Sequence, residues 1–108
     1  MEKPVPKHRL VDSPLTVAAL YHFALLDNLD QKRRGLLDIC DKNEILGTFL
    51  LAEEGINGTV AGGSEAINLV IDYICSWTEV EKIDVKFSES FSRNFRRMKV
   101  KIKNEIVT

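Results

Sequence analysis

Two periodicities of apolar residues predict strands and helices in a regular order along the chain. Alternating apolar and polar residues are typical of a half-buried strand, whereas apolar residues three to four apart are typical of an amphipathic helix. The sequence AEEGINGTVAG lies between two such regions and predicts a β-hairpin. The predicted elements are a strand at 15–24, a helix from about 29 to 42, hairpin strands at 45–52 and up to 61, a helix at 64–77, and strands at 83–88 and 98–103.

This order of elements predicts an α+β, ferredoxin-like fold. Two β–α–β units joined through a central hairpin form the split βαβ, or acylphosphatase-like, topology, in which two helices cover one face of an antiparallel sheet. We expect one such domain over residues 15–108, ending in a basic C-terminal strand. Residues 1–14 hold all three prolines of the chain and predict a flexible lead-in.

The hairpin allows two turns. Gly55 fits a left-handed position in a turn at Glu53-Glu54-Gly55, whereas Asn57-Gly58 fits a type I′ turn. We favour the turn at Gly55 because it gives two strands of equal length. That register puts Phe49, Leu51 and Asn57 on one face of the sheet, and this face is too apolar to be exposed to water alone.

The charge of the chain is small in total but unevenly distributed. The 108 residues have a formal net charge of −1, and residues 90–104 contain six cations and no acid, which leaves nine bases against sixteen acids elsewhere. Lysines on an edge strand can serve to discourage aggregation, and the same cations can track a phosphate backbone; the sequence leaves both interpretations open. The six cations are Arg93, Arg96, Arg97, Lys99, Lys101 and Lys103. Lys32, Arg33 and Arg34 fit either a phosphate contact or a solvated helix face.

No residues assemble into a catalytic or metal-binding motif. Cys40 and Cys75 lie far apart in helix-like contexts and are expected to be buried, reduced thiols. His22 has no acid or nucleophile motif beside it. No apolar run approaches the roughly 20 residues of a membrane span, and the N-terminus lacks the apolar core of a signal peptide, so we expect a cytoplasmic protein.

Three blocks of sequence carry a resemblance to a known family. They are VAALYHF at Val17–Phe23 followed by Leu26-Asp27, AEEGINGTVAG at Ala52–Gly62, and FRRMKVKIKNEIVT at Phe95–Thr108. Together, and in this order, they resemble the N-terminal region of the rhodanese-domain-containing, oxygen-dependent tRNA uridine 5-hydroxylases. GINGT with RMKVK downstream is the most specific part of the match.

This resemblance implies a parent enzyme that converts the wobble uridine of tRNA to 5-hydroxyuridine with molecular oxygen. A rhodanese domain, expected after residue 108, carries the essential cysteine in that family. Neither Cys40 nor Cys75 lies in such a loop, so we expect no catalytic residue, metal or cofactor in this chain. The expected partners are tRNA and the rhodanese domain.

The expected role of this domain is therefore accessory. The six cations are the candidate tRNA contacts, and the candidate docking residues are Phe49, Leu51, Glu53, Glu54 and Asn57. The alternatives are a purely structural interdomain module and a small-molecule-binding regulatory domain. An RNA-recognition motif is disfavoured because 98–103 has no aromatic residue, and an acylphosphatase because Leu25-Leu26-Asp27 has no arginine.

Overall fold

The computed structural model describes residues 14–91 and 97–106 of the chain. Within these ranges the chain forms the predicted elements in the predicted order. They are β1 (Leu15–Phe23), α1 (Leu29–Lys42), β2 (Leu46–Ala52), β3 (Gly55–Gly62), α2 (Ser64–Cys75), β4 (Val85–Ser90) and β5 (Met98–Ile102). All of the predicted lead-in except Pro14 lies outside the described residues.

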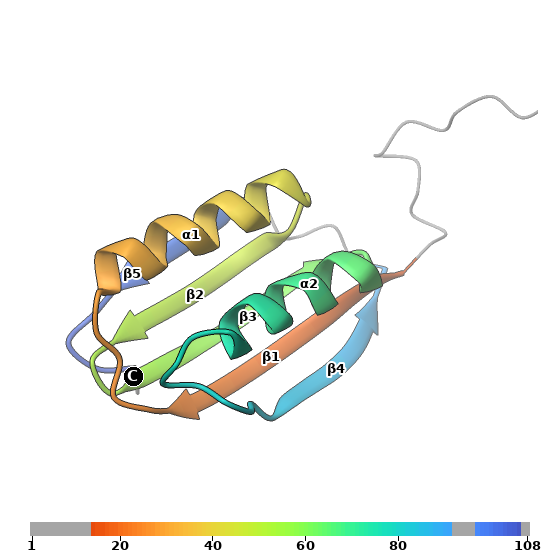
Figure 1. Ribbon diagram of the computed structural model, residues 1–108. Coiled ribbons are helices and arrows are strands. Elements are labelled where there is room, and N and C mark those ends of the chain that lie inside the picture. The colour runs from red at the N-terminus through yellow and green to blue at the C-terminus, as the bar shows by residue number, and fades with distance from the viewer. Residues whose placement is uncertain (1–13, 92–96, 107–108) are drawn as a thin grey trace, which may run out of the picture.

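The strands form one sheet in the order β4-β1-β3-β2-β5 (Figure 1). β1 is antiparallel to both β3 and β4, and β2 is antiparallel to β3, which is the predicted ferredoxin-like arrangement. β5 adds to the free edge of β2 and runs parallel to it. The predicted antiparallel sheet is therefore confirmed for four strands, and the basic C-terminal strand makes the sheet mixed.

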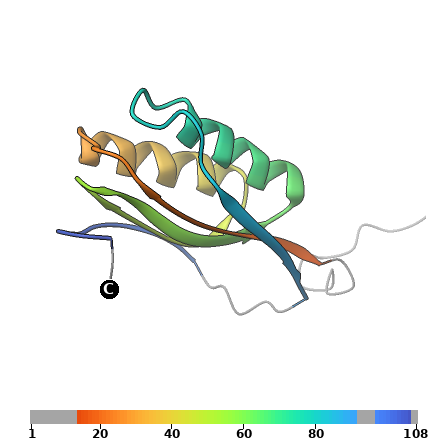
Figure 2. The same cartoon turned by 90° about the horizontal axis from the view of Figure 1, so that it is seen from below.

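Both helices cover the same face of the sheet (Figure 2), and the core lies between them and the strands. α1 contributes the buried residues Leu36 and Cys40, and α2 contributes Ile67, Val70 and Ile74. These residues belong to the two apolar stripes that the helical period predicts. The sheet side of the core consists of Ala18, Leu20, Phe49, Leu51, Ile56, Val60 and Val100. Full burial of one such large aliphatic or aromatic side chain stabilises the fold by about 1.5–3 kcal/mol.

The two helices approach closely at Gly35 of α1. A Cβ at this position would collide with the hydroxyl of Tyr73 on α2. The Tyr73 ring also meets the Trp77 ring edge to face, with centroids 5.9 Å apart. Glycine inside a helix costs about 1 kcal/mol relative to alanine. The close packing of Tyr73 explains why α1 nevertheless has a glycine there.

The register of the hairpin differs from the favoured prediction by one residue. Ala52 pairs with Gly55, so Glu53 and Glu54 form a two-residue turn, whereas the prediction placed Gly55 in the turn and Ala52 opposite Ile56. Gly55 has φ +154°, and a Cβ there would collide with the carbonyl oxygen of His22 on β1. A shift of one residue moves every side chain of a strand to the other face of the sheet.

Smaller differences concern the ends of elements. Gly63 is the N-cap residue of α2, which ends at Cys75, two residues before the predicted end. β4 begins at Val85, two residues later than predicted. Asn28 is the N-cap residue of α1. In the described part of the chain, no helix has the length and apolar character needed to cross a membrane.

Candidate nucleic-acid interface

The side of the sheet away from α1 and α2 is named the open face (Figure 2). Side chains alternate between the two faces along each strand, and directly paired residues of neighbouring strands share a face. The strands contribute to the open face Leu15, Val17, Ala19, Tyr21, Phe23, Leu46, Thr48, Leu50, Ala52, Asn57, Thr59, Ala61, Lys86, Ser88, Ser90, Lys99 and Lys101. These strand positions include three lysines and no acidic residue. A chain with a net charge of −1 therefore has one sheet face on which the strands carry only positive charge.

Two of the lysines lie on β5, the strand predicted to be basic. Lys99 pairs with Thr48 and Lys101 with Leu50, and both lysines are exposed. The residue between them, Val100, points to the core and is 3% exposed. This alternation fixes β5 to the sheet through its apolar side and presents its cations to solvent.

The remaining predicted RNA-contacting cations flank β5. Arg97 and Lys103 are exposed, and their backbone groups bond to β2: the amide of Gly47 donates to the carbonyl oxygen of Arg97 (3.4 Å), and the amide of Lys103 donates to that of Leu51 (2.8 Å). Arg93 and Arg96 lie outside the described residues. Four of the six predicted cations are thus placed on one edge of the sheet.

The open face also exposes two aromatic side chains of β1. Tyr21 is 45% exposed and Phe23 is 58% exposed. Their rings meet edge to face, with centroids 5.1 Å apart and an interplanar angle of 70°. Large exposed aromatic rings on a sheet surface are typical of binding surfaces.

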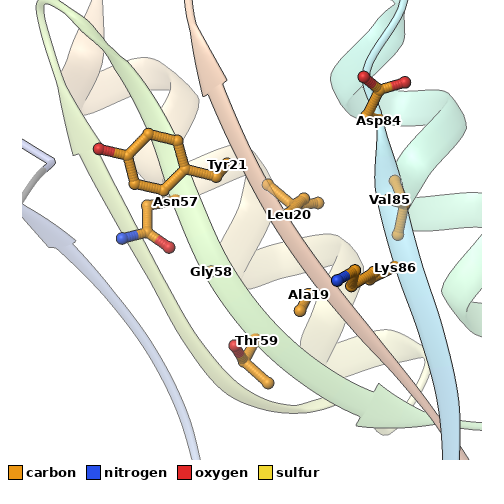
Figure 3. Close-up of a pocket in the computed structure, with 9 residues that line it drawn as sticks. All are labelled: Ala19, Leu20, Tyr21, Asn57, Gly58, Thr59, Asp84, Val85 and Lys86. Carbon is orange, nitrogen blue, oxygen red and sulfur yellow. The ribbon is translucent and has the colours of Figure 1, made fainter.

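A shallow groove of about 470 Å³ runs beside Tyr21 on the open face (Figure 3). The Tyr21 ring lies above Asn57 at one end, and Lys86 reaches from β4 toward β1 farther along. Thr59 contributes a hydroxyl to the floor, and Asp84, just before β4, is the acid of the groove lining. Apolar walls with a few polar groups are typical of small-ligand and base-binding sites.

The predicted docking role of Phe49 and Leu51 is wrong. Both side chains are 0% exposed because the observed register turns them toward the helices and into the core. The favoured register had put them on the opposite face with Asn57. They cannot contact another domain without unfolding this one.

Two of the other predicted docking residues, Glu54 and Asn57, hold the segment after β5. The amide of Ile106 donates to Oε2 of Glu54 at 2.8 Å, and Nδ2 of Asn57 donates to the carbonyl oxygen of Ile106 at 3.0 Å. Ile106 itself is 0% exposed, and its Cδ1 lies close to Gly55. Glu53 is exposed at the turn. The hairpin tip therefore anchors Ile106, 49 residues beyond Asn57 in the chain.

A charged cluster occupies the junction between β1 and α1, on the helix side of the sheet. Nζ of Lys32 donates to the carbonyl oxygen of Asp27 at 2.6 Å and lies 3.1 Å from Oε2 of Glu79 and 3.3 Å from Oδ1 of Asp27. The same ammonium lies 5.3 Å from the centroid of the Trp77 ring. Lys32 is 8% exposed, so it ties α1 to the α2–β4 loop and does not face solvent.

Arg33 also has a structural contact. Its Nε donates to the carbonyl oxygen of Val100 on β5 at 2.8 Å. Arg34, in contrast, is exposed on α1. Of these three neighbouring cations, only Arg34 fits the solvated helix face that the sequence allowed.

The cluster makes the stability of the domain depend on pH below about 4.5. Hydrogen bonds with Asp27, its own backbone and Lys32 lower the pKa of Glu79 from 4.5 to about 2. A depressed carboxyl pKa stabilises the folded state above the unfolded-state pKa, and this stabilisation is lost as the pH falls toward the folded-state pKa. We expect Glu79→Gln to lower the melting temperature by a few degrees at pH 7 and by progressively less between pH 4.5 and pH 2.

Thermal melts of the wild type and the variant, recorded by circular dichroism across pH 2–7, measure this difference. Glu81→Gln, an exposed acid two residues away, is the matched control. A difference between wild type and Glu79→Gln that stays constant down to pH 2 would contradict the lowered pKa.

Cys40 lacks the setting of a reactive thiol. Burial raises the pKa of Cys40 to about 12, so its thiol stays protonated at neutral pH. Cys75 is half-buried on α2 and unpaired. Among residues 14–91 and 97–106, no group of three or more His, Cys, Asp or Glu side chains could hold a metal ion.

A sequence comparison identifies the family. The UPF0176 acylphosphatase-like domain matches residues 15–106, which cover nearly all of the chain. The chain belongs to this family. The resemblance found in the three sequence blocks is thereby confirmed at the level of the domain.

Two curated relatives of this UPF0176 domain have the same name. Proteins named tRNA uridine(34) hydroxylase are 48% identical over 92 residues in Bartonella henselae and 50% identical over 95 residues in Mesorhizobium japonicum. These matches cover 85% and 88% of this chain. The chain spans 30–31% of the length of these two relatives.

Solved structures support the fold alone. An acylphosphatase from Coxiella burnetii has a TM-score of 0.55 at 9% identity, covering 81% of this chain and 90% of its own. The photo-activated state of BlsA has a TM-score of 0.60 at 21% identity, covering 84% of this chain and 69% of its own. The loop between β1 and α1 has no arginine, which is the feature that disfavoured an acylphosphatase from the sequence. The nearest buried cation, Lys32 of α1, is already paired with the carboxylates of Asp27 and Glu79.

The sequence arguments missed three open-face residues of this UPF0176 domain. Tyr21 and Phe23 were missed because the test for stacking aromatics was applied to 98–103, and Lys86 was missed because it lies outside the cationic segment 90–104. The period-two pattern of 15–24 does place Tyr21 and Phe23 on one face. Which face is open depends on the helices, and a strand pattern with two apolar sides does not reveal that.

Proposed function

We propose that this chain is the N-terminal accessory domain of an enzyme that hydroxylates uridine 34 of tRNA. Membership of the UPF0176 family and the names of the curated relatives support this proposal. Because the chain spans 30% of the first relative, hydroxylation is assigned to a following domain, of the rhodanese type, with molecular oxygen as co-substrate. The expected location of such an enzyme is the cytoplasm, where tRNA is found.

We further propose that this domain helps to bind tRNA through the β5 edge of its open face. The observation that carries this proposal is the position of Lys99 and Lys101, which are exposed side by side on a face whose strands carry no acid. Ammonium groups in such a row contact the phosphate backbone and release counterions from it. Arg97 and Lys103 extend the row at both ends.

The double substitution Lys99→Gln and Lys101→Gln tests this role. Each lost phosphate contact lowers the slope of log affinity against log salt by nearly one, so the slope should fall by about 1.5 to 2. Fluorescence anisotropy of labelled tRNA with the purified chain, titrated between 50 and 200 mM salt, measures the slope.

The matched control is the pair Arg34→Gln and Lys42→Gln, which removes the same charge from exposed positions of α1. We expect this control to keep the salt slope of the wild type. Equal losses of salt slope in the two double variants would show that only net charge matters. An unchanged slope in Lys99→Gln/Lys101→Gln would show that the β5 edge does not contact tRNA.

The hairpin tip is proposed as the docking side of the domain. Glu54 and Asn57 hold Ile106 in place, which supports a fixed attachment of a following domain at this end of the sheet. Glu53, exposed at the turn, is available to contact that domain. Phe49 and Leu51 have no part in this proposal because they belong to the core.

A further inference from the structure

We propose that the groove beside Tyr21 on the open face is a stacking site for an unpaired nucleotide base. The inference rests on the proposed tRNA-binding function and adds a second kind of contact to it. β5 would hold phosphates, whereas Tyr21 and Phe23 would hold the flat face of a base that is not part of a double helix.

The first support is the exposure of the two rings. Tyr21 and Phe23 lie on β1, a central strand, and yet they are 45% and 58% exposed. Their edge-to-face contact at 5.1 Å holds both rings in a defined orientation without covering them. Aromatic rings on a sheet are stacking platforms for bases, and they accept every base because each has a π face.

The second support is the groove itself. Its volume of about 470 Å³ falls within the range of small-ligand sites. The hydroxyl of Thr59, the side-chain oxygen of Asn57 and the ammonium of Lys86 line it, and they can bond to the edge of a base that stacks at the Tyr21 end (Figure 3). Asp84 lies in the same lining and offers an acceptor for base N–H groups.

The third support is the charge around the rings. Lys86 on β4 lies on one side of β1, and Lys99 and Lys101 on β5 lie on the other side, across β3 and β2. A polyanionic strand that crosses the sheet from β5 to β4 meets cations at both edges and aromatic rings between them. This order of groups fits a single RNA strand better than it fits an apolar protein surface, which would gain nothing from the lysines.

The test uses fluorescein-labelled decauridine as single-stranded RNA and a fully paired RNA duplex of the same length. We expect Tyr21→Ala and Phe23→Ala each to weaken decauridine binding by about 5- to 150-fold and to leave the salt slope unchanged. Tyr21→Phe should bind nearly as tightly as the wild type because it keeps the ring. Duplex RNA should bind more weakly than decauridine.

Phe87→Ala is the matched control. Phe87 is 55% exposed on β4, but it pairs with Ala18 and so lies on the helix side of the sheet. We expect this variant to bind decauridine like the wild type, and melting temperatures of all variants verify that they are folded.

The outcomes separate this inference from the tRNA-binding proposal. If Tyr21→Ala and Phe23→Ala bind decauridine like the wild type while Lys99→Gln/Lys101→Gln has a lower salt slope, the stacking site is wrong and the phosphate contact stands. If Phe87→Ala weakens binding as much as Tyr21→Ala, the site is also wrong. If the wild type binds neither RNA, both proposals fail.

Discussion

Replacing Phe49 by alanine is expected to lower the free energy of unfolding by about 3–5 kcal/mol. Phe49 is the largest side chain of the core with 0% exposure, and it lies between Gly58 on β3 and Val100 on β5. Removing the ring loses its transfer free energy and leaves a cavity that a close-packed core refills only in part. Urea denaturation followed by circular dichroism measures the loss.

The neighbouring residue makes this a test of the hairpin register. Leu50 faces the other way and is only half-buried, so Leu50→Ala should cost clearly less than Phe49→Ala. A larger cost for Leu50→Ala would contradict the observed register and restore the one favoured from the sequence. Because a small domain has only about 5–15 kcal/mol of stability, Phe49→Leu serves as a milder substitution at the same position.

The register shows where sequence reasoning reached its limit. Glycine content and β-prone flanks located the hairpin, but a three-residue turn ending at Gly55 and a two-residue turn at Asn57-Gly58 both satisfied the pattern, and the observed turn at Glu53-Glu54 is neither of them. Gly55 instead begins β3 and pairs with Phe23 on the neighbouring strand β1, where the carbonyl oxygen of His22 leaves no room for a Cβ. Such a contact joins residues 33 positions apart and is not visible in a local pattern.

The helices were predictable for the opposite reason. The apolar stripes of α1 and α2 are local, and Leu36, Cys40, Ile67, Val70 and Ile74 are buried as their spacing predicts. Lys32 lies in α1, and its burial was not predicted because its partner Glu79 is 47 residues away. Local spacing predicts which apolar residues are buried. Whether a charged residue is also buried depends on an oppositely charged partner that can be distant in the sequence.

The candidate interface was likewise predictable in its local pattern and not in its long-range pairing. The alternation in 98–103 predicted one apolar and one cationic side of β5, and Lys99 and Lys101 lie as that pattern requires. The pairing of β5 with β2, in parallel, was not predictable because it depends on which sheet edge is free. This pairing puts the lysines on the same face as Tyr21 and Phe23, and only that combination suggests a surface for single-stranded RNA.

The last expected result concerns the segment that follows β5. We expect Ile106→Ala to lower the free energy of unfolding by about 2–5 kcal/mol, although Ile106 lies in no helix or strand. Its side chain is 0% exposed and packs against Gly55, and its amide and carbonyl groups are bonded to Glu54 and Asn57. A loss of stability this large, at a residue outside the helices and strands, is expected only where the segment is a fixed part of the fold.

Glu105→Ala is the matched control, because Glu105 is the exposed neighbour in the same segment and should change stability by less than about 0.5 kcal/mol. Amide hydrogen exchange adds a local measurement: the amides of Ile106 and Lys103 should exchange slowly in the wild type, since they donate to Glu54 and Leu51. Fast exchange at both amides, together with a small effect of Ile106→Ala, would show that the hairpin tip does not anchor this segment. A large effect would instead make the sequence AEEGING, from Ala52 to Gly58, the element that fixes the C-terminal segment to the sheet, which is the role that the proposed attachment of a catalytic domain requires.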